Sequence, residues 1–306
     1  MRQFITRRLG YSLLSLLLLS LTIFFFVRVT GDPASLLVEP GASEEDIAAI
    51  HQKFGLDRPL WVQYGLFMWS LAHGDLGQSF YYQTPVFDLY LDRLPYSLLL
   101  ALVAMAFSLL VGIPSGILAA VRVGRFWDSA GKLFALLGLS LPSFFVGLVM
   151  ILVFTVYLGW LPSSGTGTPL HVIMPAFALG WYFAAAHMRM TRSSMLEVLG
   201  SEYIKLARLK GLPQALVIGK HAFKNALIPV MTLAGINLVL MINVAVVVET
   251  VFAWPGVGRL LYEGISFRDF PVVQGVVIMG GTMIVAMNLL VDVGYAVIDP
   301  RIRLEK

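Results

Sequence analysis

The sequence predicts an all-α integral membrane protein with six transmembrane helices. Of its 306 residues, 58% are apolar and only 13% are charged, which is too few charges for the surface of an ordinary water-soluble domain. Apolar runs of transmembrane length recur along the chain, and the basic residues gather in alternate connecting segments. These three observations exclude a soluble enzyme or a soluble binding module.

Six apolar runs are long enough to cross a hydrocarbon core of about 30 Å, which requires roughly 20 helical residues. They span residues 9–27, 96–121, 133–161, 170–188, 226–248 and 272–291. The third run contains Pro142, and the fourth contains Pro175 and two histidines. The first run follows three arginines and resembles a signal peptide, but it is longer than the usual apolar core and no A-x-A site follows, so we expect a retained first span.

The distribution of charge predicts the orientation in the membrane. Sixteen of the 22 Lys and Arg residues lie on the side of the termini, and twelve of the 18 acidic residues lie on the opposite side. Because basic residues are enriched in cytoplasmic loops, both termini are expected in the cytoplasm.

Residues 31–94 form the largest segment on the outer side. A cap at Ser43 followed by acidic residues predicts a helix that runs to Phe54 and stops at Gly55, and a second helix is expected after Pro59. Four large side chains at helical spacing on the second helix suit either an interfacial helix or a docking surface for a partner: Trp61, Tyr64, Met68 and Trp69.

Residues 189–225 predict a helix, a turn and a second helix on the cytoplasmic side. The first helix is expected from Ser194 to Lys210, with Gly211 as its stop and Pro213 in the first turn of the next helix. Ile204, Ala207 and Gly211 share one stripe, surrounded by Lys205, Arg208 and Lys210. Small side chains favour close approach to a protein groove, and the basic residues leave contact with lipid headgroups open.

The sequence lacks the residues and motifs that several kinds of chemistry require. The chain has no cysteine, no phosphate-binding G-x-x-x-x-G-K-[ST] loop, no H-E-x-x-H and no G-x-S-x-G, and its five histidines are scattered. Catalysis, a resident metal and nucleic-acid binding are therefore not expected. Asp292, near the cytoplasmic end of the last run, suits a structural role better than a proton relay. Asn237, Asn243 and Asn288 suit interhelical hydrogen bonds, with a polar translocation path as the alternative.

Two segments carry a family resemblance. Residues 202–212 (E-Y-I-K-L-A-R-L-K-G-L) and 221–229 (H-A-F-K-N-A-L-I-P) resemble the coupling motif of binding-protein-dependent ABC importer permeases, in the form of the dipeptide, oligopeptide and nickel branch. Ala207 and Gly211 match the general E-A-A-x-x-x-G pattern, whereas Lys205 and Leu206 depart from it. Further similar segments are residues 30–33, 55–60, 74–77, 93–95, 191–194, 249–258 and 299–303.

The resemblance implies a type I ABC importer permease fold with a helical extracytoplasmic insertion between helices 1 and 2, in the bacterial inner membrane. Its parts would be a tail and first span (1–30), the insertion (31–94), a permease core (95–298) with coupling helices at about 194–225, and a tail (299–306). Implied partners are a homologous second permease, two ABC ATPase subunits and an extracytoplasmic solute-binding protein. ATP and Mg²⁺ would be bound by the ATPases, so this chain would be neither an enzyme nor a cofactor protein.

The resemblance also assigns residues. Contact with the ATPase would come from Glu202, Tyr203, Lys205, Ala207, Arg208, Lys210 and Gly211. An outer gate or docking loop would be formed by Glu249, Phe252, Trp254, Pro255 and Gly256. The implied mechanism is alternating access for dipeptides, oligopeptides, glutathione, opines, nickel chelates or oligosaccharides. A secondary transporter and a membrane enzyme are the competing functions.

Overall fold

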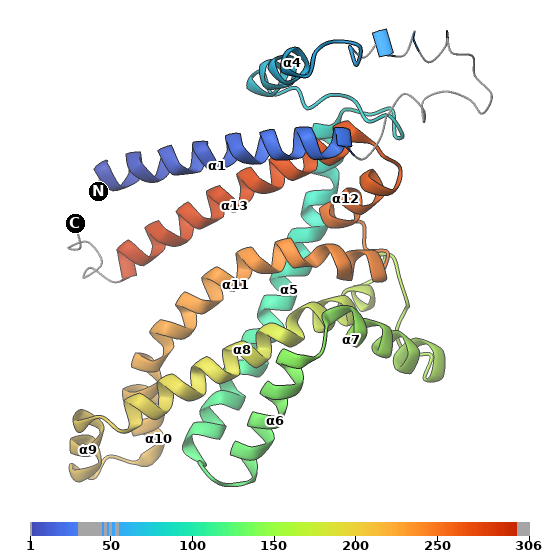
Figure 1. Ribbon diagram of the computed structural model, residues 1–306. Coiled ribbons are helices and arrows are strands. Elements are labelled where there is room, and N and C mark those ends of the chain that lie inside the picture. The colour runs from blue at the N-terminus through green and yellow to red at the C-terminus, as the bar shows by residue number, and fades with distance from the viewer. Residues whose placement is uncertain (1, 30–44, 46–47, 49–50, 53–54, 299–306) are drawn as a thin grey trace. The chain divides into compact units, whose positions relative to one another are not determined.

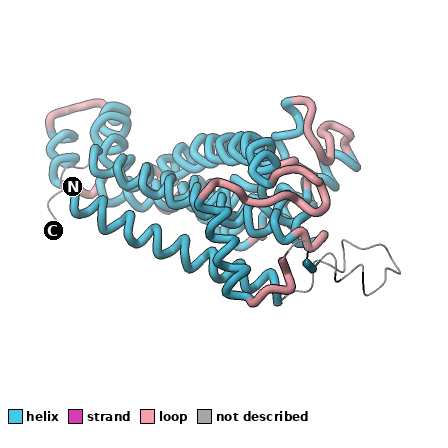
Figure 2. Tube along the Cα trace, turned by 90° about the horizontal axis from the view of Figure 1, so that it is seen from above, coloured by secondary structure: helices cyan, strands magenta, loops and turns pink. Residues whose placement is uncertain are grey.

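The computed structural model describes residues 2–29, 45, 48, 51–52 and 55–298, with side chains described except at 2–9 and 289–298 (Figure 1). The chain forms two compact units. The first unit comprises Met1–Pro95 and Gly256–Lys306, and the second comprises Tyr96–Pro255. Among the described residues every regular element is a helix, and only an isolated β-bridge joins Gln78 to Pro85 (Figure 2).

The helices of the first unit are α1 (Arg2–Val29), α4 (Leu60–Ala72), α12 (Val257–Ser266) and α13 (Phe270–Ile298). Helix α5 (Val86–Val121) begins in the first unit and continues into the second. The second unit adds α6 (Phe126–Ser140), α7 (Ser143–Met150), the π-helix η1 (Ile151–Tyr157), the 3-10 helix η2 (Pro169–Val172), α8 (Ile173–Leu199), α9 (Glu202–Leu209), α10 (Gln214–Leu216), the π-helix η3 (Val217–Phe223) and α11 (Lys224–Val251).

Among the described residues, five helical segments are long and apolar enough to cross a membrane, and a bent pair of helices makes six if it counts as one span. A helix satisfies its own backbone hydrogen bonds, which is why apolar runs of this length become helices in lipid. The helical class predicted from the sequence is therefore confirmed.

The bent pair replaces the straight third span expected at residues 133–161. Helix α6 and the continuous run α7–η1 meet at an angle of 102°. Pro142 caps α7 and has no backbone N–H, and Leu141 before it is extended at φ −88° and ψ 124°. A residue that precedes proline avoids the helical region, so the break lies where the sequence places the proline.

Two predicted boundaries were wrong. Helix α5 starts ten residues before the expected start of the second span, inside the segment assigned to the insertion at 31–94. The helix expected from Ser194 to Lys210 is divided, because α8 continues to Leu199 and α9 starts only at Glu202.

Of the helix expected from Ser43 to Phe54, only Glu45, Ala48, His51 and Gln52 are described, and all four are helical. The tail at 299–306 lies outside the described residues, as does the side chain of Asp292.

In the first unit, α4 packs across the end of α1. The Ser20 Oγ lies 3.0 Å from the Tyr64 hydroxyl, and the Arg28 Nε donates to Gln63 Oε1 at 3.0 Å. Four large side chains of α4 were predicted to share one face. Trp61 and Trp69 are exposed, whereas Tyr64 and Met68 are partly buried.

The core of the second unit lies between α5, α7, α8 and α11. Its buried residues include Leu100, Leu179, Phe183 and Met241. Small residues allow α5 and α8 to approach closely: a Cβ added to Gly112 would lie 2.7 Å from the carbonyl oxygen of Ala184, and one added to Gly116 would lie 2.6 Å from that of Met188. Close backbone approach at small residues is typical of helix packing in membranes.

Candidate functional site

The predicted coupling segment forms a short helical hook at one end of the second unit (Figure 1). Helix α9 begins after Ser201, which has extended backbone angles, and ends at Lys210. Gly211 then adopts φ +75°, a conformation that side chains disfavour, and Pro213 precedes α10. The stop at Gly211 was predicted from the sequence and is confirmed. Pro213 was expected in the first turn of the next helix, but it lies just before α10 as its N-cap.

The inner face of α9 is anchored in the chain's own core. Ile204 is fully buried and Ala207 is 8% exposed. Both belong to a cluster with Met195 of α8, Val217 of η3 and Ala226 of α11. The hook is therefore packed against α8 and against η3, which continues directly into α11.

This packing corrects the interpretation of the small-residue stripe. Ile204 and Ala207 were expected to face a partner groove, but the small side chain of Ala207 instead lets α9 approach its own domain. Ala207 is buried in this cluster, and its part in coupling to an ATPase stays a prediction. Gly211 is exposed and acts through its backbone angle.

The outer face of α9 carries the other predicted residues. Tyr203, Lys205, Arg208 and Lys210 are exposed, and so is Glu202, whose carboxylate accepts from Lys205 Nζ at 2.7 Å. The Tyr203 hydroxyl accepts from Asn225 Nδ2 at 2.9 Å. An exposed ion pair of this kind contributes little to stability, so these charges are available for recognition.

Two leucines that the sequence analysis did not single out lie on the same outer face. Leu209 is 85% exposed and Leu206 is 53% exposed. The outer face of α9 therefore exposes an apolar pair surrounded by cations, opposite a buried face. The signal in the sequence was the alternation of leucine with basic residues from Lys205 to Lys210, which only the buried face makes interpretable.

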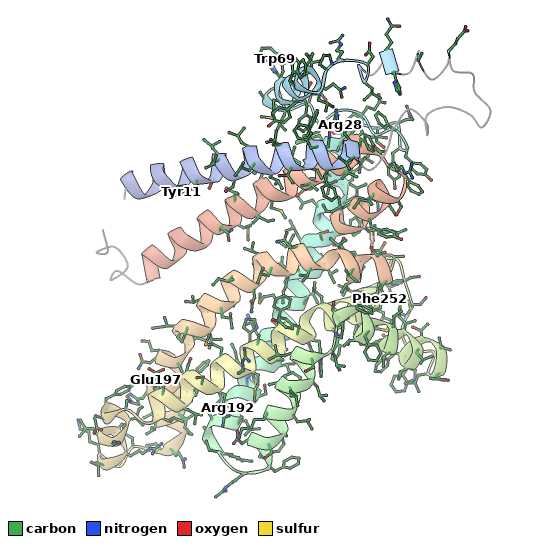
Figure 3. The ribbon with its side chains drawn as sticks, in the orientation of Figure 1. Tyr11, Arg28, Trp69, Arg192, Glu197 and Phe252 are labelled. Atoms are coloured by element: carbon green, nitrogen blue, oxygen red, sulfur yellow. The ribbon has the colours of Figure 1, made fainter. Side chains whose placement is uncertain are left out.

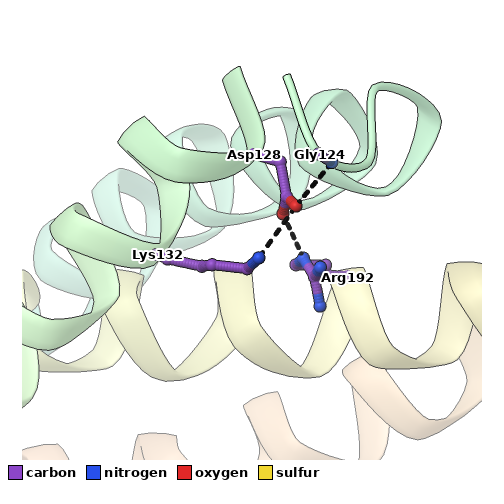
Figure 4. Close-up of polar contacts among 4 residues, drawn as sticks. All are labelled: Gly124, Asp128, Lys132 and Arg192. Atoms are coloured by element: carbon purple, nitrogen blue, oxygen red, sulfur yellow. Dashed lines mark hydrogen bonds and ion pairs between the residues drawn. The ribbon is translucent and has the colours of Figure 1, made fainter. Parts of the chain in front are cut away.

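A buried carboxylate holds α6 against α8 near the hook. Asp128 is 0% exposed and accepts hydrogen bonds from the Gly124 backbone N–H at 2.9 Å, from Lys132 Nζ at 2.9 Å and from Arg192 Nε at 2.8 Å (Figure 4). Arg192 reaches it from α8, 64 residues further along the chain (Figure 3). The spacing of Asp128 and Lys132 was visible in the sequence, but the Arg192 contact was not.

The three asparagines expected at interhelical contacts or in a path have different surroundings. Asn237 is buried, and its Nδ2 donates to Nε2 of the buried His187 at 3.2 Å, which joins α11 to α8. Asn243 is exposed and donates to the Val239 carbonyl of its own helix at 2.9 Å. Asn288 of α13 is exposed. Asn237 thus makes the interhelical hydrogen bond that was expected, and the translocation path stays a prediction for the three asparagines.

The residues predicted for an outer gate or docking loop are mostly buried. Glu249 is 0% exposed and accepts from Ser97 Oγ at 2.6 Å, and Trp254 is 3% exposed and donates from Nε1 to the Tyr96 carbonyl at 3.0 Å. Phe252, 2% exposed, lies at the carboxyl end of α11 (Figure 3). Pro255 is half-buried and Gly256 is buried. Buried side chains do not contact a docked protein, so of the two alternatives the outer gate stays the prediction for Glu249, Phe252 and Trp254.

On the side predicted to be outside, the first unit has a polar cluster that the sequence analysis missed. Asp269 Oδ2 accepts from Ser79 Oγ at 2.5 Å and from the Tyr81 N–H at 3.0 Å. Tyr82 donates to Glu263 at 2.6 Å, and burial together with this hydrogen bond raises the pKa of Tyr82 above its ordinary value. These contacts fasten the loop before α5 to α12 and to the start of α13.

Comparison with known proteins identifies the chain's relatives. Residues 112–304 match the family described as binding-protein-dependent transport system inner membrane component, and residues 1–101 match the N-terminal region of such membrane components. The chain belongs to this family. It is therefore a multi-pass inner-membrane component of a binding-protein-dependent transport system.

Several named relatives align over the whole chain. The dipeptide transport system permease protein DppB of Escherichia coli K12 is 40% identical over 100% of both chains. A putative peptide transport system permease protein of Brucella abortus is 41% identical over 99% of both, and the glutathione transport system permease protein GsiC of Salmonella choleraesuis is 38% identical over 99% of both.

Solved structures support the fold. An amino acid ABC transporter chain superimposes with a TM-score of 0.55 at 14% identity, covering 68% of this chain and 92% of that one. A chain of the MetNI methionine ABC transporter, in an inward-facing conformation, gives 0.52 at 21% identity, covering 68% and 96%. The fold is that of an ABC importer permease.

Proposed function

We propose that this chain is one permease subunit of a peptide importer and that α9 receives the motion of a partner ATPase. The observation that carries the coupling role is the geometry of α9. Its inner face is buried against α8 and η3, and its outer face exposes Leu206 and Leu209 among cations.

Peptides are the proposed substrate class because relatives that align along the whole chain are named dipeptide and peptide permeases. A relative at 38% identity is named for glutathione, so short peptides of unusual linkage belong to the same proposal. The binding protein would select the solute, and the permease would provide a weakly binding polar passage between its two subunits.

The proposed cycle uses partners for every chemical step. Two ATPase subunits bind ATP and Mg²⁺ and hydrolyse ATP, a loaded binding protein docks outside, and a homologous second permease completes the passage. Alternating access follows when closure of the ATPases moves the two hooks, because each ATP state stabilises a different arrangement of the spanning helices. No resident cofactor is required of this chain.

The test replaces Leu209 with Ser in the complete importer, reconstituted in proteoliposomes with its cognate partners. Leu209 would be buried when the ATPase binds, so its loss should weaken ATPase association about tenfold and reduce ATP-dependent peptide uptake to a similar extent. The melting temperature of the isolated chain should stay unchanged, because Leu209 is exposed there. Val123→Ser is the matched control, because Val123 is an exposed apolar residue in the α5–α6 turn on the same predicted side.

Equal uptake by both variants would contradict the coupling role of α9. Peptide uptake by this chain alone, driven by an ion gradient and without an ATPase, would contradict the importer itself and favour a secondary transporter.

A further inference from the structure

A groove runs between α6 and α8 at the same end of the second unit as the hook. Its volume is about 360 Å³. The lining combines apolar side chains, among them Leu136, Leu139 and Met188, with three cations: Lys132, Arg189 and Arg192. The groove is separate from the outer face of α9, none of whose residues lines it.

The charges of the groove do not cancel. Asp128 neutralises one positive charge while it contacts both Lys132 and Arg192, so this trio keeps a net charge of +1 (Figure 4). Arg189 is exposed and, among the described residues, takes part in no ion pair. No acidic side chain is among the described residues that line the groove. The site therefore has an excess of two positive charges, which favours an anion.

Donors for an anion remain after Asp128 is satisfied. A lysine ammonium has three N–H groups, and Lys132 directs one contact to Asp128. An arginine has five, and Arg192 uses its Nε for Asp128. The carboxylate fixes both cations beside the groove, so an incoming anion meets side chains whose positions are already set.

The apolar half of the lining indicates an amphiphile rather than a free anion. Leu136 is exposed on α6, a helix of the bent pair that is apolar enough to be part of a membrane span. Side chains exposed on a spanning helix face acyl chains, and basic pockets between such helices bind anionic headgroups on the cytoplasmic side. A ligand with one negative charge next to apolar tails matches both halves.

We propose that this groove binds an anionic phospholipid of the surrounding bilayer, with the phosphate at Arg189, Lys132 and Arg192 and an acyl chain along Leu136 and Leu139. Bound lipid would brace α6 against α8 beside the hook. The proposal goes beyond the importer function and holds whatever solute is transported.

The test measures lipid binding to the purified full-length chain by native mass spectrometry after delipidation. Phosphatidylglycerol should bind with about fivefold higher affinity to the wild type than to Arg189→Gln, the loss expected for one cation near a headgroup. Phosphatidylcholine, which has no net charge, should bind both proteins equally and weakly.

Arg125→Gln is the matched control, because Arg125 is an exposed cation just before α6 that does not line the groove. It should bind phosphatidylglycerol like the wild type. In the same lipid, the melting temperature should rise more for the wild type than for Arg189→Gln, because a ligand that binds only the folded state stabilises it.

Three outcomes would overturn the proposal. The first is equal binding of phosphatidylglycerol and phosphatidylcholine, and the second is equal loss of affinity in Arg189→Gln and Arg125→Gln. The third is complete displacement of the lipid by millimolar inorganic phosphate, which would make the site one for a free anion. None of these outcomes bears on ATP-dependent uptake, so the importer proposal would stand.

Discussion

Single polar residues inside the second unit serve the packing of the helices. His187 is fully buried and Asn237 is 5% exposed, and their contact crosses from α8 to α11. The other ring nitrogen of His187 and the hydroxyl of Thr191 are buried without a hydrogen-bond partner among the described residues. The Asn237 amide is thus the only described hydrogen-bond partner of the His187 ring.

Replacing Asn237 with Ala should destabilise the chain by about 1–3 kcal/mol, because both ring nitrogens of His187 would then be buried without a partner. Thermal unfolding of the full-length chain in detergent measures this effect. The control is Asn243→Ala, which removes only a contact to the residue's own helix on an exposed position and should leave the melting temperature unchanged. Equal melting temperatures for the two variants would show that the Asn237 contact carries no stability.

At the scale of elements, α8 is the helix on which the second unit is assembled. Small residues of α5 press against it on one side, and on another side Gly138 of α6 approaches Ala185. The same helix supplies Arg192 to Asp128 and ends one turn before α9. Helix α8 therefore contacts both the hook and the core helices α5 and α6.

Replacing Gly112 with Ala should destabilise the chain by about 1–3 kcal/mol. Its Cβ would lie 2.7 Å from the Ala184 carbonyl oxygen and 3.1 Å from the Met188 nitrogen, which are backbone atoms with little freedom to move. Gly219→Ala is the control, because nothing lies within 4 Å of its added Cβ and alanine favours a helix. Thermal melting should therefore separate the two variants, and a Gly112→Ala chain as stable as the control would mean that α5 and α8 are not in close contact.

At the scale of the whole molecule, the bent pair α6 and α7–η1 decides the topology. If the pair crosses the membrane, six spans place α9 and the termini on one side. If it enters and returns, the loop that follows η1 stays on the side of the α5–α6 turn. The distribution of Lys and Arg favours the crossing.

Whether the bent pair crosses the membrane can be measured directly by cysteine labelling. The sequence has no cysteine, so single cysteines can be added without removing native ones. In intact cells, a membrane-impermeant maleimide should label Thr166→Cys, in the exposed loop after η1, and also His73→Cys, the expected outer control. It should label Val123→Cys, in the exposed α5–α6 turn, only after the membrane is permeabilised. Protection of Thr166→Cys until permeabilisation would show that the pair returns without crossing.

Properties that depend on neighbouring residues were predictable from the sequence. The helical class and the apolar runs follow from hydropathy, and the stop at Gly211 follows from a glycine's access to positive φ followed by a proline. Family membership was predictable for the same reason, since the order and spacing of short segments are properties of the chain alone.

Tertiary structure decided whatever depends on contacts between distant residues. It buried Ala207 and exposed Leu209, it brought Arg192 to an aspartate 64 positions away, and it enclosed Glu249 and Trp254 where an outer gate or docking loop was expected. Pro142 marked a break, but the 102° angle is a property of two helices and not of one residue. A local sequence pattern indicates that a helix face carries apolar or small side chains. Only the packed structure shows which residues cover that face.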